Sequence, residues 1–111
     1  MATSTSVASS LAFNTAGATS SVADISASTN DTVTAYILPV ANPSKLGYEV
    51  ILDVGPDGTN WFPAASFKML GDRTTMAQFS VNGIKASKAR LRQSDVNQGS
   101  NALKISAWIS A

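Results

Sequence analysis

The chain has 111 residues, of which 44% are hydrophobic and only 14% are charged, and its formal net charge is +1. It is long enough for one domain with a real core, and its weakly charged polar surface suits strand-rich proteins and permanent assemblies. The absence of cysteine and histidine excludes disulfides, thiol catalysis, and the commonest general base and transition-metal ligand.

Residues 1–30 are dominated by Ser, Thr and Ala, with scattered apolar anchors such as Leu11 and Phe13. We predict an extended N-terminal arm over this range, part of it strand. Its start has neither a basic region nor a long apolar run, so we expect no secretory signal and synthesis in the cytoplasm. No stretch approaches the eighteen or so apolar residues of a membrane helix, so no membrane partner is expected.

From residue 31 onward, apolar and polar residues alternate with a period of two, in runs typical of half-buried strands. The clear runs are 32–38, 48–54, 74–81, 88–94 and 102–109. In addition to these runs, a short strand is expected to begin near Trp61. Turn-forming residues separate these runs, and no window predicts a helix longer than about two turns. The pattern predicts an all-β, antiparallel, jelly-roll-like β-sandwich over 31–111. It does not fix the strand order, so the choice between a jelly roll and an immunoglobulin-like sandwich stays open.

The turn between two of these strands reads Pro56-Asp57-Gly58 and is followed at once by Trp61 and Phe62. The favoured interpretation is that one ring caps the core and the other covers a sheet edge. The alternatives are a sugar-stacking platform, formed with Tyr48, and an anchor between subunits. The acids near this turn are too few for calcium, which takes six to eight oxygen ligands, so no metal site is predicted.

Lys88, Arg90 and Arg92 share one face of a predicted strand, and we call them the basic stripe. No aromatic residue interleaves with the stripe and the chain is barely basic, which disfavours nucleic-acid binding. We expect the stripe to be solvated or to face acidic groups of a protein partner. Trp108 lies on the polar face of the last predicted strand, where either the arm or a partner covers it.

The charges are unevenly distributed along the chain. Residues 1–67 hold five acids and one base, and residues 68–111 hold seven bases and two acids, which gives −4 and +5 and sums to +1. Two oppositely charged halves can pair within the fold or pair one copy with a neighbour, and the second alternative would favour self-association. Neither a catalytic triad nor a glycine-rich phosphate loop can be found, so we predict no enzyme, no catalytic residue and no cofactor.

The turn "DGTNW" (57–61) after an alternating strand, and the C-terminal segment "ARLRQSDVNQGSNALKISAWISA" (89–111), carry a family likeness. Over residues 45–111 the chain resembles small virion proteins of tailed bacteriophages, most of all the decoration (cement) proteins on the capsids of short-tailed phages. The resemblance implies a non-enzymatic structural protein, made in the host cytoplasm, that binds the outer capsid surface.

Such a protein bridges subunits of the major capsid protein and acts as a homodimer or homotrimer. The expected contact residues are Trp108, Lys88, Arg90, Arg92, Leu11 and Phe13. Two other functions stay open. One is a carbohydrate-binding sandwich module that uses Tyr48, Trp61 and Phe62 as its platform. The other is a structural component of a phage tail, neck or fibre.

Overall fold

The computed structural model describes residues 4–13, 18–26, 31–43, 45–94 and 103–111. In these residues the chain forms strands and no helix, so none of them belongs to a helix long and apolar enough to cross a membrane. The strands are β1 (Ser4–Ala12), β2 (Ala23–Asp24), β3 (Val33–Ala41), β4 (Tyr48–Gly55), β5 (Phe62–Met69), β6 (Ala77–Val81), β7 (Lys88–Gln93) and β8 (Lys104–Ser110).

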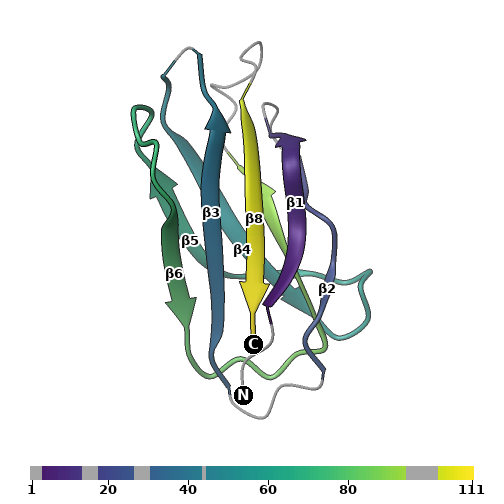
Figure 1. Ribbon diagram of the computed structural model, residues 1–111. Coiled ribbons are helices and arrows are strands. Elements are labelled where there is room, and N and C mark those ends of the chain that lie inside the picture. Colours follow the sequence, from purple (N-terminus) through teal and green to yellow (C-terminus); the bar gives the residue numbers. More distant parts are fainter. Residues whose placement is uncertain (1–3, 14–17, 27–30, 44, 95–102) are drawn as a thin grey trace.

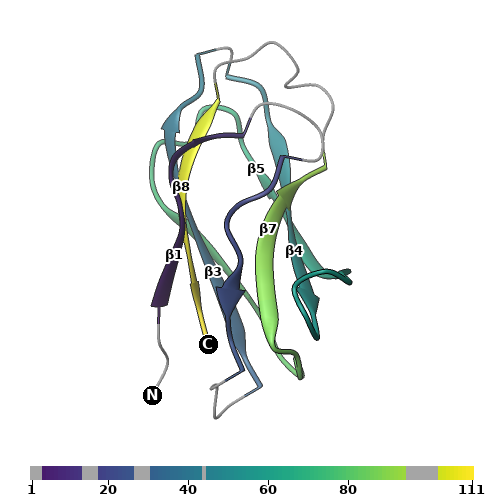
Figure 2. The ribbon, with the colours of Figure 1, turned by 90° about the vertical axis from the view of Figure 1, so that its right-hand side faces the viewer.

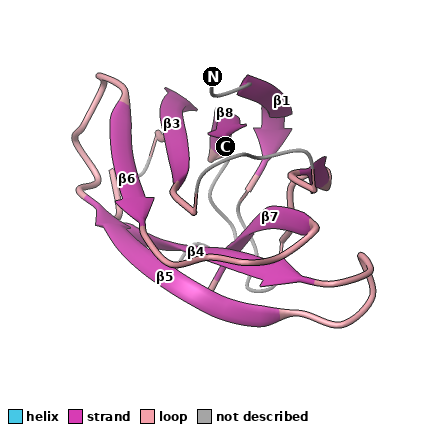
Figure 3. Cartoon of the chain, turned by 90° about the horizontal axis from the view of Figure 1, so that it is seen from below, coloured by secondary structure: helices cyan, strands magenta, loops and turns pink. Residues whose placement is uncertain are grey.

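The strands form two four-stranded antiparallel sheets that pack face to face (Figure 1; Figure 3). The first sheet has the order β1-β8-β3-β6 and the second has the order β2-β7-β4-β5. The pairs β1/β8, β2/β7, β3/β6 and β4/β5 are nested about the β4–β5 connection. One long antiparallel ribbon is thus rolled into two layers, which is the topology of a jelly roll. The predicted fold class is confirmed, and the structure supplies the strand order.

Figure 2 shows the two layers from the side. The core lies between them and follows the alternation of the sequence. In β3, Val33, Ala35 and Ile37 are buried, and the residues between them are only half-buried. β8 contributes Ile105, Ala107 and Ile109 in the same way. Because successive side chains of a strand point to opposite faces, one face of each sheet can be wholly apolar.

One aromatic contact links the edges of the two sheets. Phe67 of β5 and Phe79 of β6 stack with ring centroids 5.5 Å apart and an interplanar angle of 6°. Since β5 and β6 are the outermost strands of their sheets on the same side, the stacked rings join the two layers along that side.

Both strands of the described N-terminal segment belong to the sandwich. β1 pairs with β8, and β2 pairs with β7. Phe13, which follows β1, is completely buried, and Val7, Ala23 and Ile25 lie in the same core. The segment predicted as an arm therefore contributes a strand to each sheet and apolar side chains to the shared core.

Two strand boundaries differ clearly from the predicted runs, whereas the boundaries of β4 and β7 agree to within one residue. β3 continues through Pro39 to Ala41, beyond the end of the predicted run 32–38. The last pair between β3 and β6 is Ile37 with Ala77, so β6 does not extend alongside Pro39 and no ladder bond on that side needs its missing N–H. β6 also begins at Ala77 and not at residue 74.

Candidate functional site

A pocket of about 680 Å³ lies at the end of the sandwich where β4 and β6 finish, the lower end in Figure 1. Three connections line it: the one from β2 to β3, the one from β4 to β5, and the one from β6 to β7. We call it the end pocket. Its lining residues are Ile25, Ser26, Asp31, Val54, Gly55, Pro56, Phe62, Gly83, Ile84, Lys85, Ala86 and Ser87.

Backbone hydrogen bonds hold these three connections together. The Ser87 N–H donates to the Gly55 carbonyl at 3.1 Å, and the Ile25 N–H donates to the Ser87 carbonyl at 2.8 Å. The Ile84 N–H donates to the Asp31 carbonyl at 2.9 Å. The walls are therefore fixed by the main chain, as expected for a preformed binding site.

The pocket combines apolar walls with a few polar groups. Ile25 and Val54 are buried beneath it, whereas the Phe62 side chain is 60% exposed. The Lys85 ammonium lies 3.0 Å from an Asp31 carboxylate oxygen, and both side chains are largely exposed. An exposed ion pair of this kind adds little stability, so both charges are available to a ligand at small cost.

The turn before Phe62 is built by Asp57. Its carboxylate accepts hydrogen bonds from the Thr59 N–H at 2.9 Å, the Asn60 N–H at 2.8 Å and the Asn60 side-chain amide at 2.7 Å. These backbone donors, Asn60 first, lower the pKa of Asp57 below its usual value. Gly58 supplies the left-handed conformation with φ 79°.

Gly55, where β4 ends, has no room for a side chain, since an added Cβ would lie 2.0 Å from the Asn60 carbonyl oxygen. The turn is therefore fixed at both ends, and it delivers Phe62 to the pocket wall.

The two adjacent aromatic residues serve different faces of the second sheet. Phe62 pairs with Val54, whose side chain is buried, and it faces the pocket. Trp61 instead stacks with Arg90, whose guanidinium carbon lies 4.4 Å from the ring centroid. Tyr48 stands at the other end of β4 and is 2% exposed, so it cannot belong to an exposed platform. The predicted platform of three rings is therefore wrong, and only Phe62 faces the end pocket.

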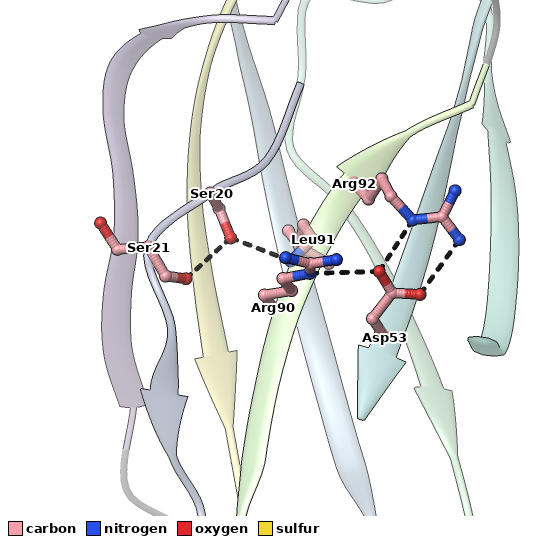
Figure 4. A network of polar contacts seen from close by, with 6 residues as sticks. All are labelled: Ser20, Ser21, Asp53, Arg90, Leu91 and Arg92. Carbon is pink, nitrogen blue, oxygen red and sulfur yellow. Dashed lines mark hydrogen bonds and ion pairs between the residues drawn. The ribbon is translucent and has the colours of Figure 1, made fainter. Parts of the chain in front are cut away.

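The basic stripe meets an acid of its own chain. The Arg92 Nε and Arg90 Nε donate to Asp53 Oδ2 at 2.8 and 3.2 Å, and Arg92 Nη2 donates to Oδ1 at 3.1 Å (Figure 4). The hydrogen bond to Asp53 raises the pKa of Arg92. Lys88 lies 3.5 Å from Asp24. These contacts connect β7 to its two neighbouring strands in the second sheet.

Alternation along the strands puts Asp53 and the basic stripe on outward faces, but only the pairing of β4 with β7 brings them together. Of the two predicted ways for the charged halves to pair, the one within the fold is therefore seen here. On the other flank of β7, the Ser20 hydroxyl accepts from the Leu91 N–H at 2.9 Å and donates to the Ser21 carbonyl at 2.9 Å (Figure 4). This hydroxyl joins the segment before β2 to the second sheet.

The other three predicted contact residues, Phe13, Leu11 and Trp108, lie in different parts of the fold. Phe13 is wholly buried, so it cannot touch a partner, and this prediction is corrected. Leu11 packs partly against the same core. Trp108 is half-buried on the outer face of the first sheet, between Ser6 of β1 and Tyr36 of β3. β1 runs beside this ring as a strand and not across it, so part of the ring faces outward.

Four polar residues of the end pocket were not predicted as site residues: Asp31, Lys85, Ser26 and Ser87. They lie in connections, where no periodic pattern marks them. The one available signal was Asn82-Gly83, which suits a tight hairpin, followed by residues that alternate poorly. In the structure the connection extends to Ser87 and forms one wall of the pocket. No cluster of three or more metal-ligating side chains occurs among the described residues.

Together, the nested strand pairs and the end pocket define a jelly-roll β-sandwich with a ligand-sized cavity between its connections. No protein-family model matches the sequence, and no curated protein matches it. Among solved structures, the chain is similar to the CBM32 module of AlyQ in complex with 4,5-unsaturated mannuronic acid. The TM-score is 0.57 at 17% identity, over 96% of this chain and 76% of that one.

A second similar structure comes from Bacillus endospore appendages, described as a novel family of disulfide-linked pili. The TM-score is 0.50 at 7% identity, over 99% of this chain and 84% of that one. At these identities both likenesses concern the fold alone.

Proposed function

We propose that this chain is a non-catalytic carbohydrate-binding module whose ligand occupies the end pocket. The observation that carries the proposal is the 60% exposed ring of Phe62 on the wall of a preformed pocket. A large exposed aromatic ring beside hydroxyl and charged groups suits a ligand with one apolar face and several polar edges. The likeness to a module bound to an unsaturated uronic acid supports the proposal as an analogy of fold.

The chemistry of the lining matches a sugar ring. The C–H face of a pyranose would lie against Phe62, with Ile84 beneath it. Ring hydroxyls would bond to Ser87, whose side chain can donate and accept, and to Ser26, whose hydroxyl donates to Asp24 at 2.6 Å and can accept from a ligand. Asp31 accepts and Lys85 donates, so their ion pair can open to receive hydroxyls or a carboxylate. A volume of about 680 Å³ accommodates one or two sugar units.

The test is a titration of the ¹⁵N-labelled chain with neutral monosaccharides, uronic acids and their disaccharides. We expect amide shift changes confined to 25–26, 31, 54–62 and 83–87. Phe62→Ala should weaken binding at least about tenfold, equivalent to about 1.4 kcal/mol. The matched control is Leu70→Ala, which removes another exposed apolar side chain, at the far end of β5. Equal affinity of both variants, or shifts away from the pocket, would contradict the proposal.

A second proposal, a structural role on a capsid surface, is favoured by a different observation. Exposed large apolar residues gather in the β3–β4 and β5–β6 connections and at the adjoining strand ends, away from the end pocket. The residues are Val40, Leu46, Leu70 and Met76. The Asn42 side-chain amide joins the two connections by donating to the Leu46 and Gly71 carbonyls at 2.9 and 3.1 Å.

Exposed apolar patches mark sites of protein contact. The partner in this second proposal is the major capsid protein, and the chain would protect the shell against heat. Imaging of particles carrying a labelled chain separates the outer capsid from a tail, neck or fibre location. Particles stripped of the chain should lose infectivity at a lower temperature, and unchanged heat resistance would contradict this role.

A further inference from the structure

The four edge strands of the sandwich differ in how they are protected from pairing with other chains. An exposed edge presents unpaired N–H and C=O groups, and proteins protect such edges with bulges, prolines, charges or short strands. β1 has two register shifts in its pairing with β8. β2 is only two residues long. β5 contains Pro63, an exposed Lys68 and a register shift.

β6 has none of these devices. Its five residues, Ala77–Val81, pair with β3 in an unbroken register from Val33 with Val81 to Ile37 with Ala77. The stretch contains neither a proline nor a charge, and Gln78 and Ser80 are exposed. In Figure 1 β6 is the outermost strand of the front sheet, hydrogen-bonded to β3 on one side.

We propose that β6 is an interaction strand that pairs antiparallel with β6 of a second copy of this chain. A two-fold axis near Phe79, the middle of the strand, would place Gln78 opposite Ser80 of the partner subunit and Phe79 opposite its own equivalent. In a symmetric pair each strand lies beside an identical strand. A charged side chain would therefore lie near the same charged side chain of the partner, and the two would repel each other. An uncharged, regular five-residue strand meets this requirement.

The flanks of β6 support a second copy as the occupant. Met76, directly before the strand, is 44% exposed and uncharged, and Asn82 directly after it is uncharged as well. In the symmetric pair these two positions oppose each other, so the seven consecutive residues that meet carry no charged side chain. A charge does lie close by, since the Arg73 guanidinium donates to the Met76 carbonyl at 3.1 Å. The joined sheet would have eight strands, with the two β6 strands at its centre.

This arrangement has a geometric consequence for the end pocket, although it does not depend on the pocket binding sugar. The pocket wall at 83–87 follows the end of β6. Because the two β6 strands run antiparallel, the two pockets would open at opposite ends of the joined sheet. A dimer would then bridge two ligand chains and not grip one chain twice.

The contact is small, since one strand pair buries less than the roughly 800 Å² per partner of a standard stable interface. The expected association is therefore reversible and visible only at raised concentration. Sedimentation equilibrium of the full chain from about 10 μM to about 1 mM brackets dissociation constants in the micromolar range. The average mass should rise from 11.5 kDa toward twice that value.

The double variant Gln78→Lys with Ser80→Lys tests the β6 edge, because it places lysines opposite lysines in the paired strands. It should stay monomeric over the whole concentration range. The matched control is Ser4→Lys/Ser6→Lys on β1, which adds the same charge to exposed positions on the other edge of the same sheet. This control should associate like the unsubstituted chain.

Mixing the lysine variant with Gln78→Glu/Ser80→Glu should restore a mass of two copies, because opposite charges then face each other. Ser80 also shares a hydrogen bond of 2.7 Å with Thr34, so Gln78→Lys alone serves as the milder variant if the double variant does not fold. A mass that stays at 11.5 kDa at about 1 mM overturns the proposal, since micromolar association would be nearly complete there. Equal loss of association in the β1 control overturns it as well.

Discussion

Arg92 lies over Asp53 with its Nε 2.8 Å from one carboxylate oxygen and its Nη2 3.1 Å from the other, and the Asp53 side chain is 1% exposed. Arg90 reaches the same carboxylate and stacks on Trp61. A buried carboxylate needs partners of this kind because desolvation alone would penalise its charge. The cluster fixes β7 against β4 and places Trp61 beside the turn that leads to Phe62.

Replacing Asp53 with Asn should therefore destabilise the fold. Removal of one partner from a fully buried ion pair costs about 3 to 5 kcal/mol. Here the arginines are partly exposed and can turn toward water, so we expect a smaller loss of about 2 kcal/mol in the free energy of unfolding. Urea denaturation measures it. Asp24→Asn removes the exposed partner of Lys88 and should leave the free energy of unfolding nearly unchanged. Similar losses for both variants would contradict this account.

The stacked pair of Phe67 and Phe79 should be energetically coupled. Each single substitution to Ala is expected to cost about 2 kcal/mol, because both rings are half-buried. The double variant should cost less than the sum of the two, by about 0.5 to 1.5 kcal/mol. A complete double-mutant cycle by denaturant unfolding measures this coupling. Strict additivity would show that the rings do not join the two sheet edges.

Asp57 makes the shape of the pocket wall sensitive to acid. Its pKa is lowered because the Asn60 and Thr59 N–H groups donate to the ionised carboxylate. The contribution of Asp57 to the free energy of unfolding is thus fully present above pH 3.8, which is its ordinary pKa. This contribution is lost as the pH falls through the lowered pKa of the folded state. Amide spectra should show 58–62 changing together below pH 3.8. In Asp57→Ala these changes should be absent, and sugar binding at neutral pH should be weaker.

The sequence predicted the layers of this protein much better than its site. Period-two alternation located β3, β4, β7 and β8, because burial on one face of a strand leaves a direct record in the residues. Strand order left no such record, so the meeting of Asp53 with Arg90 and Arg92 could not be foreseen. The end pocket depends on three connections that are distant in the chain, and no local pattern reports that they meet.

Tyr48 was misplaced for a different reason. Its position in the alternation of β4 puts it on the same apolar face as Val50 and Leu52, and all three residues are buried. Its role in a platform rested on its ring chemistry and not on its periodicity. For residues within strands, parity was the better guide.

The buried hydroxyl of Tyr48 is expected to lower the stability of the fold. This hydroxyl has no hydrogen-bond partner in the part of the chain that the structure describes. An unsatisfied buried polar group costs about 1 to 3 kcal/mol, so Tyr48→Phe should stabilise the fold by about 1 kcal/mol. Tyr36 is only half-buried on the outer face of β3, and Tyr36→Phe should leave the unfolding free energy nearly unchanged.

A pH series distinguishes this effect from a general gain in hydrophobicity. Burial raises the pKa of Tyr48 to about 12, against an ordinary value of 10.0, although the charge of Arg73 acts in the opposite direction. Between these two values the unfolded chain releases the phenol proton and the folded chain keeps it, so stability falls as the pH rises. Tyr48→Phe lacks this loss, and its advantage over the unsubstituted chain should widen from pH 10 to pH 12. Parallel pH profiles would show that the phenol is solvated in the native state.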